Sequence, residues 1–229
     1  AGENDNLIRC STLIGGAGND LIAGSSVDEW LIGFGGNDPL RGRGGDDQLY
    51  GGIDDDSLDG GSGNDQLLGE HSIAGNTLEG AGGDDNLISD FGPDLLVGGS
   101  GNDLLKPEGG ADTVFGNGGD DIVQASESEG NYGADVYSGG GGIDLIDYSS
   151  GAAVTITLDD LANDGPSGDT DDVARDFDII NGSHLDDLLD ASTAGHRVTL
   201  NGTGGNDTLI GGGSSDSLDG DLGDDSLIG

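Results

Sequence analysis

Large aliphatic residues recur every nine residues along most of this 229-residue chain, and Gly-rich turns separate them. The clearest run covers residues 33–68, four successive nonapeptides that read GFGGNDPLR, GRGGDDQLY, GGIDDDSLD and GGSGNDQLL. Only position eight of each unit is reliably Leu, Ile or Val, and the first six positions are typical of a tight turn. In the three-residue strand that remains, the central side chain points to the opposite side from its two neighbours. The pattern therefore predicts an all-β, parallel β-solenoid in which two half-coils form each turn and position eight lines the interior.

The register of the repeat changes at three places, which divide the chain. An eleven-residue version covers residues 69–79, and a fourteen-residue version covers residues 125–138. Residues 148–181 depart most, because they begin with an alternating stretch typical of a strand and continue into an acidic, turn-rich loop. We therefore expect repeats at 1–147, an irregular strand-plus-acidic-loop insertion at 148–181, and repeats again at 182–229, all within one continuous solenoid.

Position six carries an acidic residue almost throughout. Residues eighteen apart stack on one edge of such a solenoid, about 4.8 Å from one another, so that Asp38 lies beside Asp20 on one edge and Asp47 beside Glu29 on the other. Stacked carboxylates repel unless a cation lies between them. The candidate metal ligands at this position are Asp5, Asp20, Glu29, Asp38, Asp47, Asp56, Asp65, Asn76, Asp85, Asp94, Asp103, Asp112, Asp121, Asp135, Asp144, Asp187, Asp207, Asp216 and Asp225.

The chemistry of these positions favours calcium. Carboxylates and backbone carbonyls offer hard oxygen ligands, and position six holds neither Cys nor His, which favours Ca²⁺ over transition metals. Mg²⁺ needs a tight octahedron, which irregular loops do not readily supply. If each stacked pair of acids holds one ion, the chain binds on the order of a dozen or more Ca²⁺. We expect the calcium-free chain to be largely unfolded, because the binding energy of the ions is then folding energy.

The charge balance agrees with bound cations. The chain has 46 acidic residues and six Lys or Arg, a formal net charge of −40, and 50 Gly. Such a charge with few aromatic residues often indicates disorder, but a disordered acidic chain has no need of aliphatic residues at a fixed spacing. Nucleic acid and anionic membranes are poor partners for this surface. No stretch is long and apolar enough to predict a membrane span.

The repeat itself resembles a known one. Residues 15–23 (GGAGNDLIA) and 202–210 (GTGGNDTLI) follow the consensus G-G-x-G-x-D-x-U-x, where U is a large aliphatic residue. The chain therefore resembles the RTX (repeats-in-toxin) nonapeptide calcium-binding family over nearly all of its length, least at 148–181. The resemblance implies a parallel β-roll, calcium-dependent folding and secretion by bacteria. Glu29 and Asn76 depart from the consensus and are expected to bind weakly.

Other candidate chemistry is sparse. The acidic loop at 164–172 is either a second calcium site or a solvated turn. His71, His184 and His196 lack zinc-type spacing, and neither a nucleophile elbow nor a P-loop is present, so we expect no enzyme activity. The single Cys10 cannot form a disulfide within one chain.

Two features of the sequence concern assembly. Alternate repeats place an apolar residue at position nine on one sheet, namely Ile14, Ile32, Tyr50, Leu68 and Ile88. These residues either form a lateral contact between copies or reflect ordinary β-propensity on a surface. Joining Gly229 of one copy to Ala1 of the next would complete a repeat in register, which predicts head-to-tail stacking into a calcium-stabilised fibre. The alternative is a carboxy-terminal secretion and folding module of a larger secreted enzyme, toxin or adhesin. A chain that begins at Ala1, without Met or a signal peptide, fits a processed or partial exported protein.

Overall fold

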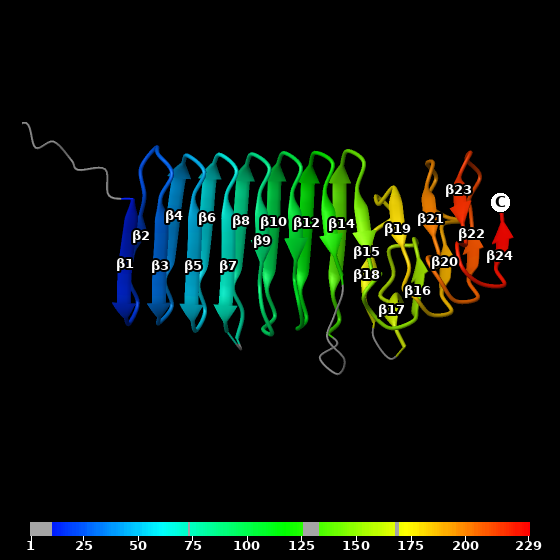
Figure 1. Ribbon diagram of the computed structural model, residues 1–229, viewed down its shortest axis with the longest axis horizontal. Coiled ribbons are helices and arrows are strands. Elements are labelled where there is room, and N and C mark those ends of the chain that lie inside the picture. Colours follow the sequence, from blue (N-terminus) through cyan, green and yellow to red (C-terminus); the bar gives the residue numbers. More distant parts are fainter. Residues whose placement is uncertain (1–10, 73, 126–132, 168–169) are drawn as a thin grey trace, which may run out of the picture.

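The computed structural model describes residues 11–72, 74–125, 133–167 and 170–229, and shows an elongated β-solenoid (Figure 1). Its coils stack along the long axis, with the strands running across that axis. The described residues contain no helix, and so none that could cross a membrane. The predicted all-β parallel solenoid is confirmed, whereas Asp5 and Cys10 lie outside the described residues.

The strands form three sheets. An 11-stranded sheet runs along one side of the solenoid, an 8-stranded sheet covers the opposite side, and a 5-stranded sheet follows it towards the carboxyl end. The 11-stranded sheet contains β1 (Thr12–Ala17), β3 (Trp30–Gly35), β5 (Gln48–Ile53), β7 (Gln66–His71), β9 (Asn86–Ile88), β11 (Leu104–Lys106), β13 (Ile122–Gln124), β15 (Leu145–Asp147), β19 (Ile179–Asn181), β21 (Thr199–Asn201) and β23 (Ser217–Asp219). The 8-stranded sheet contains β2 (Ile22–Ala23), β4 (Pro39–Gly44), β6 (Ser57–Ser62), β8 (Thr77–Gly82), β10 (Leu95–Ser100), β12 (Thr113–Gly118), β14 (Val136–Gly141) and β18 (Asp172–Val173). The 5-stranded sheet contains β16 (Val154–Thr157), β17 (Gly165–Pro166), β20 (Leu188–Asp190), β22 (Thr208–Ile210) and β24 (Ser226–Ile228).

Neighbouring strands pair in parallel, except for the antiparallel pair β16 and β17. The usual offset between paired coils is 18 residues, as the nine-residue period predicts, and longer coils absorb the irregular units with offsets of 20 and 23 residues. Residues 148–181 are spread over the sheets: β16 and β17 belong to the 5-stranded sheet, β18 to the 8-stranded sheet and β19 to the 11-stranded sheet. The division into 1–147, 148–181 and 182–229 remains a prediction.

The core is a ladder of position-eight side chains. Leu31, Leu40, Leu49 and Leu67 are completely buried, and the same holds along the stack as far as Leu209. The flanking positions seven and nine are half-buried or exposed. Position eight therefore points inward, as the three-residue strand predicts. Larger aromatic side chains replace the aliphatic ladder near the irregular coils, where Tyr137, Tyr148 and Phe177 are fully buried.

Candidate metal centre

Position-six side chains form two columns along the solenoid. The first column precedes the strands of the 8-stranded sheet, and the second precedes those of the 11-stranded sheet. The first column is Asp20, Asp38, Asp56, Asn76, Asp94, Asp112 and Asp135; the second column is Glu29, Asp47, Asp65, Asp85, Asp103, Asp121 and Asp144. In both columns the side-chain oxygen of one coil accepts the backbone N–H of the position-six residue in the preceding coil. The N–H of Asp38 donates to Asp56 Oδ1 at 2.8 Å, and the N–H of Asp47 donates to Asp65 Oδ1 at 2.7 Å. The side chains therefore turn into the solenoid, where most are buried.

The second carboxylate oxygen of many of these side chains lacks the hydrogen bond that the first oxygen accepts. Among the described residues, ten buried position-six Asp side chains have an Oδ2 atom that accepts no hydrogen bond: Asp38, Asp47, Asp56, Asp65, Asp85, Asp103, Asp112, Asp121, Asp144 and Asp207. Burying one polar atom without a partner costs roughly 1–3 kcal/mol, and more when it is charged. Ten such atoms would cost roughly 10–30 kcal/mol, as much as or more than the entire net stability of an ordinary domain, about 5–15 kcal/mol. These oxygens therefore need cations or protons if the fold is to persist.

Nine of the ten bare oxygens lie beside a glycine at position one of their own repeat, whereas the repeat of Asp112 has Pro107 there. Asp20, which is not one of the ten, has the same arrangement. A Cβ atom on Gly15 would lie 2.8 Å from Asp20 Oδ2 and 2.9 Å from the carbonyl oxygen of Gly33 in the next coil. Carboxylate and carbonyl oxygens therefore converge on the space beside the glycine Cα, and any larger residue would fill that space. The same convergence occurs at Gly33, Gly42, Gly80, Gly98 and Gly116.

Burial perturbs these acids strongly. Desolvation raises the pKa of Asp56 and Asp85 to about 7, and that of Asp112 to about 8. The backbone N–H from the preceding coil acts in the opposite direction, and the like charges of neighbouring acids raise the pKa further. Burial likewise raises the pKa of Asp47 and Asp121 to about 6.

The donor set fits calcium. It consists of carboxylate and carbonyl oxygens in an irregular turn, with no nitrogen or sulfur atom that a transition metal would prefer. In the described parts of the chain, no group of three or more His, Cys, Asp or Glu side chains could hold a metal by itself. Backbone carbonyls such as that of Gly33 must therefore supply part of any coordination shell.

Comparison with known families identifies the repeat. The sequence profile of the RTX calcium-binding nonapeptide repeat matches residues 11–26, 32–67, 74–105, 97–127, 129–147 and 199–227, which is more than half of the chain. The chain belongs to this RTX repeat family. No curated protein matches the chain significantly. The profile leaves out residues 148–198, where the sequence departs most from the repeat.

Not every position-six residue of this RTX chain has a bare oxygen. Asn76 places its amide Nδ2, which cannot bind a cation, where Asp38 and Asp56 have a carboxylate oxygen. The Glu29 carboxylate accepts the N–H of Ser25 at 2.7 Å as well as the Ser25 hydroxyl. Asp135 Oδ2 accepts the Tyr137 hydroxyl at 2.6 Å.

The acidic loop at 164–172 contributes to the core as well. Asp164 is only 1% exposed, so it is not a solvated loop residue. Its carboxylate accepts the N–H groups of Thr157 and Val173 at 2.6 and 3.0 Å, and the Thr157 hydroxyl at 3.0 Å. Asp164 is thus already satisfied by the chain, and a second calcium site in this loop remains a prediction.

Sequence reasoning missed a further column at position five. Asn64 N–H donates to Asp46 Oδ1 at 2.9 Å, and Asp84 N–H donates to Asn64 Oδ1 at 3.0 Å. Each of these exposed side chains accepts from the coil that follows it, whereas a position-six side chain accepts from the coil that precedes it. The frequent Asp or Asn at position five of the repeat was the available signal.

Proposed function

We propose that this RTX chain is an extracellular, calcium-binding structural protein without catalytic activity, which folds when calcium enters its turns. The observation that carries the proposal is the set of ten buried carboxylate oxygens without a hydrogen-bond donor, from Asp38 to Asp207. Cations at these turns would remove both the desolvation cost and the repulsion along each column. An environment rich in calcium, outside the cell, supplies such ions.

Calcium titration tests this proposal. Chain treated with chelator is expected to have little β-structure by circular dichroism, and added Ca²⁺ is expected to restore it cooperatively with several ions bound per chain. Mg²⁺ at the same concentration is expected to restore much less. A chain that keeps its full β-signal after complete removal of calcium at neutral pH would contradict the proposal.

End-to-end stacking is the finer part of the proposal. In the last coil, Leu227 at position eight is 50% exposed and Ile228 is 52% exposed, whereas Leu209, one coil earlier, is fully buried. One further coil would cover these side chains and pair with β24. We propose that the first coil of a second copy supplies this cover, so that copies stack into a calcium-stabilised fibre.

A second candidate is favoured by the same exposed strand. If the polypeptide continues, its next repeat would cover β24, and the chain would be a secretion and folding module of a larger secreted enzyme, toxin or adhesin. Electron microscopy of the purified chain in Ca²⁺ distinguishes the two. Filaments that dissolve in chelator support stacking, whereas single short rods at all concentrations support the module.

The outer face of the 11-stranded sheet favours a lateral contact between copies. From β1 to β13, positions seven and nine of this sheet carry no acidic residue, although the chain has 46 of them. Ile14, Ile32, Tyr50, Leu68 and Ile88 are in register along it. The opposite sheet carries Asp59 and Glu79 at its outward positions. Two polyanions can approach most closely through the face that lacks acids, so we propose a second copy as its partner.

A further inference from the structure

The turns of this chain have two backbone forms, which differ at position two of the repeat. In each of the ten position-six turns described above as having a bare Asp oxygen, the residue four before the acid has a positive φ angle. These residues are Phe34, Arg43, Gly52, Gly61, Ala81, Gly99, Glu108, Asn117, Gly140 and Thr203. We call these the open turns, because nothing in the turn donates to the second carboxylate oxygen.

Four other turns take a different form. The residues at the same place before Glu29, Asp94, Asp187 and Asp216 are Ser25, Asp90, Ser183 and Gly212, and none of them has a positive φ. In each, the N–H of that residue donates to the acid four residues later, at 2.7, 3.3, 2.6 and 2.7 Å respectively. We call these the closed turns.

Serine strengthens the closed form. The Ser183 hydroxyl donates to the Asp187 carboxylate at 3.0 Å, in addition to the donation from its own N–H, and Ser183 is fully buried. Ser25 makes the equivalent pair of bonds to Glu29. A serine side chain favours this local bonding to a following acid, and a non-glycine residue also avoids the cost of a positive φ. The open turns accept that cost at Phe34 and Arg43.

We propose that the open turns bind calcium and that the closed turns are metal-free joints, in which N–H and hydroxyl donors of the chain replace the ion. The inference rests on the proposed calcium function and adds which turns perform it. Asp187 shows the replacement most clearly: Ser183 occupies one of its oxygens and the N–H of Val154 occupies the other at 2.7 Å. A carboxylate with all of these donors has no bare oxygen left for a cation.

Tyr137 satisfies the second oxygen of Asp135 by another route. Its ring takes position eight, where the other coils have an aliphatic residue, and its hydroxyl reaches back to Asp135 Oδ2. A Leu side chain at position eight has no hydrogen-bond donor.

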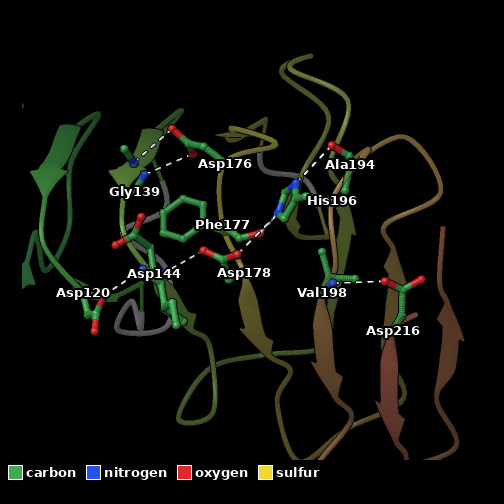
Figure 2. A network of polar contacts seen from close by, with 12 residues as sticks. Asp120, Gly139, Asp144, Asp176, Phe177, Asp178, Ala194, His196, Val198 and Asp216 are labelled. Atoms are coloured by element: carbon green, nitrogen blue, oxygen red, sulfur yellow. Dashed lines mark hydrogen bonds and ion pairs between the residues drawn. The ribbon is translucent and has the colours of Figure 1, made fainter. Parts of the chain in front are cut away.

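Two of the four closed turns, those of Asp187 and Asp216, lie beyond Asp144. Figure 2 shows that region: Asp178 accepts the N–H of Asp144 at 3.1 Å, and Asp216 accepts the N–H of Val198 at 3.0 Å. The two ring nitrogens of His196 lie 3.1 Å from the carbonyl oxygens of Ala194 and Phe177, respectively. Of the position-six acids after Asp144, only Asp207 has a buried bare oxygen among the described residues. Calcium is therefore concentrated between Asp38 and Asp144.

The test uses two neighbouring turns as a matched pair. Ser183→Gly removes the hydroxyl that donates to Asp187, and glycine permits the positive φ of an open turn. The carbonyl oxygen of Gly202 already lies near the Asp187 carboxylate, as in the open turns. We expect this variant to bind one more Ca²⁺ per chain than the wild type, counted by native mass spectrometry. Thr203→Gly, in the adjacent turn that is already open, is expected to leave the count unchanged. An unchanged count in Ser183→Gly, or an equal gain in both variants, would overturn the proposal.

Two further measurements separate this proposal from the calcium function itself. Asp207→Asn is expected to lower the calcium count by at least one, and if it does not, the proposed calcium function fails at an open turn. In crystals of the calcium-loaded wild type, we expect anomalous density beside Asp47 and Asp207 and none beside Asp187 or Glu29. Density of equal strength beside Asp187 would refute the metal-free joint while leaving the calcium function intact.

Discussion

At position six, one carboxylate oxygen holds the neighbouring coil and the other faces a carbonyl oxygen. Asp85 shows both: its Oδ1 accepts the N–H of Asp65 at 2.7 Å, and its Oδ2 has no donor. Asn76 keeps the first function, because its Oδ1 accepts the N–H of Asp56 at 2.8 Å, but it presents an amide nitrogen on the other side. The choice between Asp and Asn at this position therefore changes the metal site without changing the contact between coils.

Restoring the acid at Asn76 should add a ligand to the first column. Asn76→Asp replaces the Nδ2 atom with an oxygen of the same size, so the backbone need not move. We expect the calcium concentration at the folding midpoint to fall about two- to tenfold, equivalent to roughly 0.4–1.4 kcal/mol. The opposite change, Asp85→Asn, is the control and should raise the midpoint. An Asn76→Asp variant that needs more calcium than the wild type would contradict the assignment.

The raised pKa values make the calcium-free fold sensitive to pH. Asp56 and Asp85 have a pKa of about 7 in the folded chain, above the 3.8 of an unperturbed Asp, so the folded state binds protons more tightly than the unfolded state. Their contribution to stability is therefore fully present below about pH 4 and is lost as the pH rises through about 7. With chelator present, we expect β-structure to be greater near pH 5 than near pH 8. Circular dichroism that does not change across this range would argue against the buried acids.

Protons and calcium should then compete for the same oxygens. Because a calcium ligand must be deprotonated, apparent calcium affinity is expected to fall as the pH drops below about 7, and calcium addition near pH 6 should release protons. Proton release measured in a weakly buffered solution checks this, with the already unfolded, urea-treated chain as control.

At the scale of the turn, the close approach of backbone atoms explains the glycine at position one. A Cβ atom on Gly42 would meet Asp47 Oδ2 and would lie 2.5 Å from the Gly60 carbonyl oxygen. Real Cβ contacts of this length essentially do not occur, so the atoms that line the turn would have to move apart. Gly35, at position three, has no atom within 4 Å of its Cβ position and no positive φ.

These two glycines provide a matched pair of substitutions. Gly42→Ala is expected to destabilise the calcium-loaded fold by roughly 2–4 kcal/mol, because it crowds both oxygens that line the turn. Gly35→Ala should change stability by no more than about 1 kcal/mol, since the added methyl meets open space. Urea denaturation in saturating calcium measures both. Equal losses in the two variants would show that general glycine flexibility, rather than the space beside Asp47, is responsible.

Much of the coil could be predicted from the sequence because its determinants lie nine and eighteen residues apart. The burial of Leu40 and the stacking of Asp38 on Asp20 follow directly from that spacing. Whether a turn is open or closed could not be predicted in the same way, because it depends on the rotation of one peptide group. The reach of Tyr137 to Asp135 was hidden for a related reason: position eight was interpreted only as a hydrophobic position.

The irregular coils show a second limit on what can be predicted from the sequence. Their neighbours along the solenoid are 34 or 36 residues away in sequence, as with Asp178 beside Asp144 and Asp171 beside Asp135. No fixed period indicates which acid continues each column at that distance. The sequence therefore predicts that the solenoid is interrupted, but not which residues bridge the interruption.

At the scale of the whole molecule, charge is distributed unevenly around the solenoid. The chain has a formal net charge of −40, yet positions seven and nine of the 11-stranded sheet from β1 to β13 carry no acid. Bound calcium would lower the negative charge of the turns, which form the two edges, and positions seven and nine of this face would carry no negative charge. Association through the face should therefore require calcium-loaded, folded chain.

A charge placed on this face tests the lateral contact. Leu68 and Val97 both occupy position nine and are both half-buried, but Leu68 lies on β7 of the 11-stranded sheet and Val97 on β10 of the opposite sheet. In a face-to-face pair, Leu68→Asp would bury an unpaired carboxylate, so we expect a loss of dimer affinity of about tenfold or more. Val97→Asp adds the same charge to the other face and should leave the dimer intact. Sedimentation velocity of both variants in saturating calcium decides the matter: if they dissociate equally, net charge controls association, and if neither differs from the wild type, the contact uses another surface.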